Sequence, residues 1–397
     1  MTPARTPRAE AHLSWRQVAT FRQRRQHLLE RVPARALVSA VGDVGGIQSQ
    51  LLSAAQLSVW ARVRDLDLAR VDAAIWEDRT LSKAWCMRRT LHLLPSDRLA
   101  VFVRGSARRA EREVAWVKTH GVGEQEVEEL VAATLRVLDH PLTRPELADH
   151  LSSSLGLRVR AKRGDGWGSR RKVPGVEIGS LTLSAGYLLH LAGARGVVCS
   201  APNRGSEATY VRADAWLPNW RDLPVEQAER LLLGTYLRAF APATPSDYAW
   251  WTGMYQSDAQ AIWASMETEM VPVEVEGWRA WALRRDLAEL EETRAADGAV
   301  RLLPYFDSFL LGHKVKQHLV GEANWGRVFR PQGWVAPVVL RHGRAIGVWA
   351  HAQRGTRLRV RVEPFHHASG RTAGEIEEEA RDLGRFLGCV SVDTEFG

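Results

Sequence analysis

The chain has 397 residues, of which 45 % are apolar and 25 % are charged. These fractions are typical of globular proteins and exclude a disordered chain, a collagen-like chain and a coiled coil, and the length predicts two or three domains. The 54 Lys and Arg residues outnumber the 46 Asp and Glu residues, which leaves a net charge of +8. A basic excess of this size favours a polyanion or an acidic surface as the partner.

The three cysteines exclude two further classes of protein. Cys86, Cys199 and Cys389 lie far apart, and no Cys-x-x-Cys pair or Cys/His ligand spacing occurs. The sequence therefore predicts neither a disulfide framework nor a zinc site. We expect no metal and no other cofactor.

Targeting and membrane signals are weak. The segment 1–10 is basic and has no apolar core, unlike a secretion signal. The most apolar stretch, 181–201, is interrupted by His190 and Arg195, so it does not resemble a membrane span. We therefore expect a cytoplasmic protein without a membrane partner.

Three similar helical units follow one another along the first two thirds of the chain. Apolar residues at intervals of three and four predict that each unit begins with an amphipathic helix, at 15–30, 124–139 and 225–240. After a short loop, each unit has a hydroxyl residue followed three positions later by a side chain that can return to its amide, which predicts the start of a second helix. These pairs are Ser53 with Gln56, Thr143 with Glu146 and Thr244 with Asp247.

A third helix and β-prone runs complete each unit. The helices are predicted near 68–77, 177–191 and 255–266, and the β-prone runs at 85–94, 197–212 and 271–283. Helix, capped helix, helix and hairpin is the order of a winged-helix domain. Three tandem copies support this interpretation; the alternative is three unrelated runs of helices and hairpins.

The last hundred residues differ from the three units. Four segments alternate in hydropathy or are rich in β-branched residues, at 300–303, 335–341, 344–350 and 357–362, and His342-Gly343 predicts a tight turn between two of them. A final amphipathic helix is predicted at 374–387. We expect a small β-barrel or sheet with one helix, and an α+β fold for the chain. The predicted domains are 1–115, 116–222, 223–298 and 299–397.

Basic residues are concentrated in three places. Arg104, Arg108, Arg109 and Arg112 recur along one helical stripe, and eight arginines occur between 323 and 362 without an acid. The third place has seven cations and one acid; the cations are Arg158, Arg160, Lys162, Arg163, Arg170, Arg171 and Lys172. Basic patches on winged-helix units predict contacts with DNA phosphates. The alternative is that each patch is only a solvated face.

Common catalytic motifs are absent from the sequence. It contains no P-loop, no Gly-x-Ser-x-Gly, no His-Glu-x-x-His and no clustered Asp-x-Asp. Asp307 stands among apolar neighbours, where a helix cap or a buried, hydrogen-bonded carboxylate is the favoured interpretation. His92, His313 and His318 are isolated, and we expect them to be structural.

A segment before Ser53 carries two amides. Gly45 and Gly46 permit a tight backbone path, and the predicted helix start keeps Gln48 and Gln50 outside the helix. Residues two apart face the same side of an extended segment but not of a helix. The two glutamines can therefore present both amides to one point, although two glutamines in a loop are usually ordinary polar residues.

Four segments, taken in order, resemble the AlkZ-type winged-helix DNA glycosylases. They are Gln48-Ser49-Gln50, Arg89-Thr90-Leu91-His92, Phe306-Asp307-Ser308-Phe309 and Arg341-His342-Gly343-Arg344. The resemblance extends from about residue 15 to 390. It implies three tandem winged helices and a C-terminal β-barrel that form a C-shaped clamp around double-stranded DNA.

The resemblance also implies an activity and its residues. Members of the family remove bulky N7-alkylguanines, and some open interstrand cross-links left by azinomycin-like antibiotics, which protects the producing bacterium. The catalytic glutamines would be Gln48 and Gln50, and the minor-groove hairpin would lie at about 340–349, with Arg341, His342 and Arg344. We expect a monomer in the bacterial nucleoid.

One position departs from the family. Ser49 replaces the usual aliphatic residue, which bears on the subgroup more than on catalysis, and Gln50 argues against a sister branch that has Gln-x-Asp. Two other functions stay open: a winged-helix transcription regulator, which usually has one such unit and a dimerisation domain, and a non-catalytic lesion-binding protein of the same fold.

Overall fold

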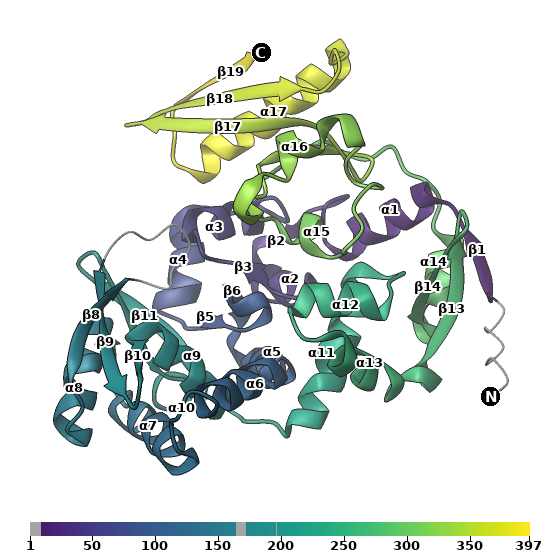
Figure 1. Cartoon of the computed structure of the whole chain (residues 1–397). Coiled ribbons are helices and arrows are strands. Elements are labelled where there is room, and N and C mark those ends of the chain that lie inside the picture. The colour runs from purple at the N-terminus through teal and green to yellow at the C-terminus, as the bar shows by residue number, and fades with distance from the viewer. Residues whose placement is uncertain (1–8, 164–171, 196) are drawn as a thin grey trace, which may run out of the picture. The chain divides into compact units, whose positions relative to one another are not determined.

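The computed structural model describes residues 9–163, 172–195 and 197–397 (Figure 1). These residues form two compact units. The first contains the chain up to Ala74, Leu232–Trp251 and Gln256–Gly397, and the second contains Ile75–Leu231 and Thr252–Tyr255. Both units mix helices and strands, so the α+β class is confirmed. No helix formed by the described residues has the length and apolar character needed to cross a membrane.

Helices make up much of the first unit. In chain order they are α1 (Trp15–Arg25), α2 (Leu37–Asp43), α3 (Leu52–Trp60), α4 (Leu68–Trp76), α11 (Val225–Phe240), α12 (Pro245–Thr252), α13 (Gln256–Ala264), α14 (Leu287–Glu292), α15 (Ser308–Leu311), α16 (Trp325–Val328) and α17 (Gly370–Phe386). The last residues of α4, the first residues of α11 and the last residue of α12 belong to the second unit.

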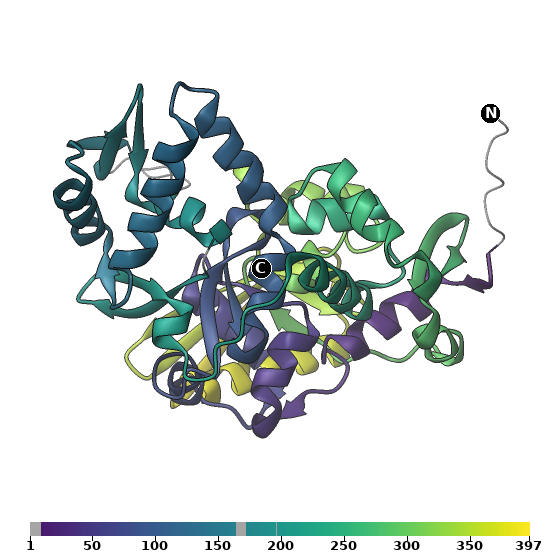
Figure 2. The ribbon, with the colours of Figure 1, turned by 90° about the horizontal axis from the view of Figure 1, so that it is seen from below.

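A three-stranded sheet lies beside α1. Strand β1 (Ala11–Leu13) pairs parallel with β13 (Met270–Val275), which pairs antiparallel with β14 (Trp278–Leu283). Both ribbon views show the short purple strand alongside the green hairpin (Figures 1 and 2). Val18 and Phe21 of α1 are buried in one core with Val271 and Val273 of β13, so residues far apart in sequence share this core.

The C-terminal residues form an open sheet. Its order is β15 (Arg301–Leu303), β16 (Val338–Arg341), β17 (Arg344–Arg354), β18 (Arg357–Pro364) and β19 (Ser391–Phe396). Strands β15 and β19 are its edges, and β19 pairs parallel with β18 after the chain has passed through α17. Of the two expected alternatives, the described residues form the sheet with one helix and not the barrel, because α17 returns the last strand to the outer side of β18 and not to β15.

The second unit contains two sheets. One has the order β6 (Leu91–Pro95), β5 (Leu81–Trp85), β11 (Val198–Arg204), β12 (Glu207–Arg212) and β7 (Leu142–Thr143). The other has the order β10 (Leu181–Ser184), β9 (Lys172–Ile178) and β8 (Val159–Arg163). Its helices are α5 (Leu99–Gly105), α6 (Ala107–Lys118), α7 (Glu124–Val137), α8 (Arg144–Leu155), α9 (Ala185–Arg195) and α10 (Ala213–Trp216).

The N-termini of three helices can be compared with the predicted caps. Thr143 caps α8, and its own amide donates to Glu146, as predicted. Thr244 and Asp247 make the same reciprocal contacts at α12. The prediction for Ser53 is wrong: α3 already begins at Leu52, so Ser53 lies in the first turn.

Candidate active site

The segment that carries the two glutamines connects α2 to α3. Gly45 and Gly46 have φ of +76° and +83°, a conformation that glycine adopts without the strain of a Cβ. The short strand β3 (Ile47–Gln48) follows, and Gln50 lies outside α3, as predicted. A Cβ on Gly45 would come within 3.0 Å of the Trp251 ring, so packing also requires glycine there.

The segment is buried up to Ser49 and emerges at Gln50. Ser49 is fully buried, Gln50 is exposed, and Gln48 is 9 % exposed. An extended chain points alternate side chains to opposite sides, but β3 ends at Gln48 and Gln50 lies in a bend, so the expectation that both amides face one point stays a prediction. Ser49 Oγ has no hydrogen-bond partner among the described residues. An aliphatic side chain would suit that position equally, so the departure at Ser49 leaves the outward side unchanged.

Helix α15 holds the start of the segment. Ser308 Oγ donates a hydrogen bond to the Gly46 carbonyl oxygen at 2.9 Å. Asp307, the residue before Ser308, caps the same helix by accepting from the Phe309 amide at 2.9 Å. The sequence interpretation of Asp307 as a cap is confirmed.

Asp307 also holds α3. Its two oxygens each accept from Arg62 at 2.7 Å, and Ser58 Oγ donates to one of them at 2.6 Å. Ser58 lies on α3 and Arg62 lies just beyond its end. The pair Asp307-Ser308 therefore contacts the chain on both sides of the glutamines.

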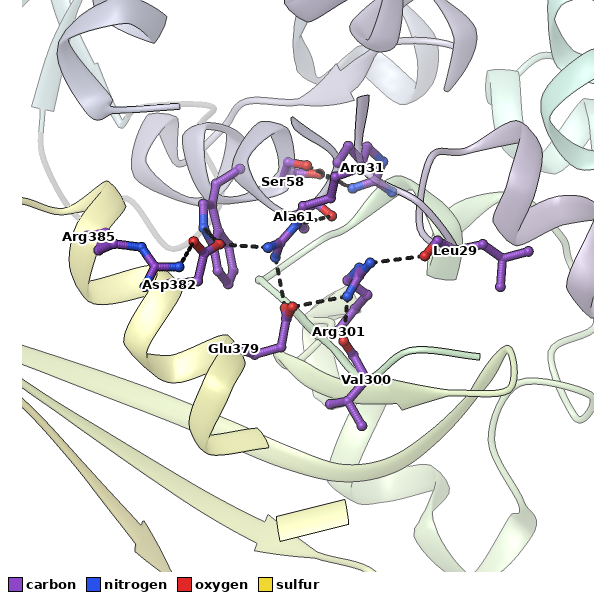
Figure 3. A network of polar contacts seen from close by, with 11 residues as sticks. Leu29, Arg31, Ser58, Ala61, Val300, Arg301, Glu379, Asp382 and Arg385 are labelled. Atoms are coloured by element: carbon purple, nitrogen blue, oxygen red, sulfur yellow. Dashed lines mark hydrogen bonds and ion pairs between the residues drawn. The ribbon is translucent and has the colours of Figure 1, made fainter. Parts of the chain in front are cut away.

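Helix α17 is fixed to the end of α3 by a network of ion pairs (Figure 3). Arg31 contacts Glu379 at 2.8 Å and Asp382 at 2.6 Å, and Arg301 contacts Glu379 at 3.0 Å. The Trp60 indole donates to Asp382 at 2.9 Å. Burial raises the pKa of Glu379 although both guanidiniums oppose this. The C-terminal helix thus stabilises the helix that follows the glutamines.

The isolated histidines are neutral parts of the packing. His92 Nδ1 donates to the Thr90 carbonyl at 3.0 Å and Nε2 accepts from Arg88 at 3.2 Å, and burial lowers the pKa of His92 to about 3. Burial also lowers the pKa of His313 and of His318, with Arg22 as the next cause for both. Their expected structural role agrees with these contacts.

The basic segment 158–172 contributes a hairpin. Strands β8 and β9 pair antiparallel, with Arg163 opposite Lys172. Arg158, Arg160 and Lys172 are exposed, and Lys162 is half-buried. Arg170 and Arg171 lie outside the described residues.

One cation of that hairpin has an acidic neighbour. Arg160 Nε is 2.7 Å from Glu177, yet the Arg160 side chain is still 69 % exposed. An exposed pair of this kind contributes little to stability and exchanges readily for a phosphate contact.

The predicted turn at His342-Gly343 is confirmed, but it packs against the protein. A Cβ on Gly343 would lie 2.6 Å from Ala19 of α1, and His342 Nδ1 accepts from the Gly298 amide at 3.2 Å. These contacts occupy the tip that we expected to enter a minor groove. A role of His342 in DNA binding stays a prediction that requires this tip to separate from α1.

The two arginines beside that turn differ. Arg341 pairs with Glu375 at 3.1 Å, donates to Thr372, and is 16 % exposed. Arg344 is exposed and has no acidic partner among the described residues. Of the two, Arg344 is the better placed to meet phosphate.

The prediction of one helical basic stripe is wrong, because its arginines are divided between α5 and α6, and two of the four are paired with acids. Arg104 pairs with Asp222 at 2.6 Å, and Arg108 pairs with Glu229. Both acids lie more than a hundred residues further along the chain, so the sequence pattern alone does not show the pairing.

A second hairpin was missed by sequence reasoning. Strand β18 pairs with β17 along its whole length, with Arg354 opposite Arg357 beside the turn that joins the two strands. Both arginines are exposed, and neither has an acidic partner among the described residues. The available signal was Arg354-Gly355-Thr356-Arg357, a turn with φ of +59° at Gly355.

Over residues 41–386 the chain matches the family described as DNA glycosylase AlkZ-like. It belongs to the AlkZ-like DNA glycosylases. A relative named interstrand DNA cross-link repair glycosylase, from Streptomyces sahachiroi, is 31 % identical over 388 residues, which cover 94 % of this chain and 97 % of that protein. The solved structure of Streptomyces sahachiroi DNA glycosylase AlkZ is similar with a TM-score of 0.80 and 28 % identity, covering 97 % of this chain and all of that one.

Membership in this family makes the chain an enzyme that acts on N-glycosyl bonds in DNA, and the resemblance noted in the sequence is confirmed. The glycosylase interpretation is thereby supported over a transcription regulator. In the part of this glycosylase that the structure describes, no group of three or more His, Cys, Asp or Glu residues is placed to hold a metal ion.

Proposed function

We propose that this DNA glycosylase hydrolyses the N-glycosidic bond of bulky N7-alkylguanines in double-stranded DNA, including those of interstrand cross-links. The name of the relative from Streptomyces sahachiroi supports the cross-link part. The observation that carries the proposal is the segment from Gly45 to Gln50, which places both glutamines outside the helices and whose flanks are held by Ser308 at Gly46 and by Asp307 at Arg62. Repair or self-resistance in the bacterial cytoplasm, by a monomer, is the setting that we propose.

Gln48 and Gln50 are the proposed catalytic residues. An N7-alkylated guanine is already cationic, so it can leave without a general acid. The enzyme then needs groups that position a water on the far side of the sugar and face the developing positive charge, as in inverting glycosidases. Amide oxygens can do both. One positioned polar group is typically worth about 10²–10³-fold in rate.

The weakness of an amide is an advantage for selectivity. A carboxylate would stabilise the sugar cation more strongly and would also assist poorer leaving groups. With amides, hydrolysis depends on a good leaving group, so cationic lesions would be removed and normal purines would not. Bulky adducts also fit poorly in a tight pocket for a flipped base, which favours a site that approaches the nucleotide without enclosing it.

DNA would be held by the winged-helix-like arrangement of the helical units and by exposed cations. The candidates in the described residues are Arg158, Arg160, Lys172, Arg344, Arg354 and Arg357. They lie on the β8–β9 hairpin, at the turn before β17 and on the β17–β18 hairpin. In each place, adjacent antiparallel strands expose cationic side chains. Such groups bind phosphate without reading sequence.

Single-turnover release of the modified base tests the catalytic proposal. The duplexes would carry N7-methylguanine or a bulky N7 adduct, and alkaline cleavage would report the abasic product. We expect Gln48→Ala with Gln50→Ala to abolish release while the affinity for DNA stays within a few-fold. Gln260→Ala, at an exposed glutamine of α13, is the matched control. Unchanged release by the double variant would contradict the assignment.

A further inference from the structure

A pocket in the second unit has a lining unlike that of the glutamine segment. Its volume is about 540 Å³, and it is lined by Arg89, Arg112, Glu113, Trp116, Tyr187 and Tyr255 together with Gly253 and Met254. All of these residues belong to that unit. Aromatic rings and guanidiniums therefore surround one space, whereas the glutamines lie in the first unit.

Trp116 offers an accessible ring. It is 48 % exposed and is the only exposed tryptophan among those that the structure describes. Its indole is held in place by His120, with ring centroids 4.1 Å apart, and by the edge of Tyr187 at 6.4 Å. A large exposed aromatic that is already fixed loses little conformational entropy when a ligand stacks on it.

A second exposed ring lies in the same pocket. Tyr255 is 58 % exposed, and the Arg112 guanidinium lies over it, 4.4 Å from the ring centroid. A cation on one side of a ring leaves the other side for stacking and places positive charge beside the ligand.

The remaining charged residues that line the pocket are fixed in position by their contacts. Arg89 has φ of +56°, contacts Glu113 at 3.2 Å, and lies 5.7 Å from the Tyr187 centroid. Glu113 is also 2.9 Å from His190. Two guanidiniums and one carboxylate line the pocket, so its formal charge favours a ligand with about one negative charge.

We propose that this pocket binds an unpaired nucleotide of the DNA strand. The base would stack on Trp116 and Tyr255, and its phosphodiester, which carries one negative charge, would lie near Arg89 and Arg112. Stacking on aromatic rings beside cations is how proteins bind single-stranded nucleic acid without strong sequence preference. A purely apolar ligand would make no use of the two guanidiniums, and a duplex base pair does not expose its ring faces.

Such a pocket would allow the enzyme to bind DNA in which one strand is locally unpaired, as it is beside a bulky or cross-linked lesion. The inference rests on the DNA-directed activity of the family and not on the roles of Gln48 and Gln50. The two proposals have different readouts, because base release tests the glutamines and nucleotide binding tests the pocket.

The experiment compares the affinity of the full-length protein for an intact duplex and for the same duplex with a single-nucleotide bulge, by fluorescence anisotropy. We expect the wild type to prefer the bulge by about tenfold. Trp116→Ala with Tyr255→Ala should remove this preference and leave the affinity for the intact duplex unchanged, whereas Trp116→Phe should retain most of it. Tyr305→Ala, at a tyrosine 37 % exposed in the first unit, is the matched control.

Competition separates the possible sources of the nucleotide. Excess deoxyadenosine monophosphate should weaken bulge binding only at millimolar concentration if the strand is the ligand. Strong competition by the free nucleotide together with no preference for the bulge would overturn the proposal and point to a soluble nucleotide. Equal losses on both duplexes in the double variant would also overturn it, since the rings would then only support the fold.

Discussion

Arg62 donates to both oxygens of the Asp307 carboxylate at 2.7 Å, and neither side chain is accessible to solvent beyond 1 %. A buried ion pair of this geometry is a poor source of net stability but a strong constraint on position, since separating the partners leaves an unpaired charge in the interior. It connects the chain just beyond α3 to the residue that precedes Ser308. The glutamine segment is therefore enclosed by contacts that both originate at one dipeptide.

Ser308 is predicted to position the segment. Replacing it by Ala removes the donor to the Gly46 carbonyl and lets residues 47–50 relax. Small misplacements of catalytic groups are costly in rate, so we expect base release at saturating DNA to slow by about 10–100-fold. Stability should fall by only about 1 kcal/mol, the usual value of one hydrogen bond.

Ser58→Ala is the matched control for that variant. Ser58 Oγ donates to Asp307 in the same cluster, but Ser58 lies near the end of α3 and not beside Gly46. It should lose similar stability and keep the wild-type rate. Equal rates in the two variants would show that the contact to Gly46 is only structural.

Gln50→Asp is predicted to change selectivity. A carboxylate at this exposed position would stabilise the sugar cation more strongly than an amide, so bases that are poorer leaving groups would also be released. We expect activity to be retained and the ratio of rates to shift towards small adducts such as N7-methylguanine. Single-turnover rates measured in parallel on small and bulky adducts give the ratio. An unchanged ratio would show that residue 50 does not determine selectivity.

Uninterrupted helical periodicity was sufficient to locate several elements. The helix Val225–Phe240 was predicted with the bounds that it has in the structure. The prediction of a helix at 177–191 is wrong in its first half, where the chain forms β9, a turn and β10. Ile178 and Leu183 are both buried, and the turn at Gly179, with φ of +53°, selects the hairpin.

The sequence alone could not show which charged residues, distant along the chain, pair with one another. The Gln-x-Gln spacing and the glycines before it were visible in the sequence, as was the apolar setting of Asp307. The partner Arg62 is 245 positions away, and no local rule identifies it. The same limit explains the basic stripe, since the acid that pairs with Arg104 lies 118 residues further along.

The arginines at the β17–β18 turn and those at the His342-Gly343 turn are predicted to contribute differently to DNA binding. Arg354→Ala with Arg357→Ala removes two exposed cations, so binding to damaged and undamaged duplexes should weaken alike. The slope of log affinity against log salt should fall by about 1.8, or 0.9 for each lost phosphate contact. Arg341→Ala with Arg344→Ala should lower it by about half as much, because Arg341 is already paired with Glu375.

Arg25→Ala is the control for these variants, since Arg25 is only 14 % exposed and pairs with Asp286 at 2.9 Å. It should leave the salt slope nearly unchanged. If the Arg341 and Arg344 variant instead slows release of bulky adducts more than it weakens binding, the turn at His342 contacts the lesion. In that case the tip must separate from α1 on DNA.

The buried histidines predict a loss of stability on mild acidification. In the unfolded chain a histidine takes up a proton near pH 6.5, whereas in the folded protein burial lowers the pKa of His92 to about 3 and that of His313 well below its ordinary value. Between these values the unfolded state binds more protons, so stability is complete above pH 6.5 and falls as the pH falls. Each histidine should cost about 2 kcal/mol between pH 6.5 and 5.

Denaturant unfolding at pH 7, 6 and 5 measures this loss, and His92→Asn isolates one contribution. The variant should be less stable at pH 7, because Arg88 loses its acceptor, but its stability should fall less steeply with acid. Carboxylates such as Glu379, whose pKa burial raises, titrate alike in the variant and the wild type, so the difference between the two proteins reports His92. Parallel pH dependences for the variant and the wild type would mean that His92 is protonated in the folded protein, and the hydrogen bond from Arg88 to Nε2 would then be wrong.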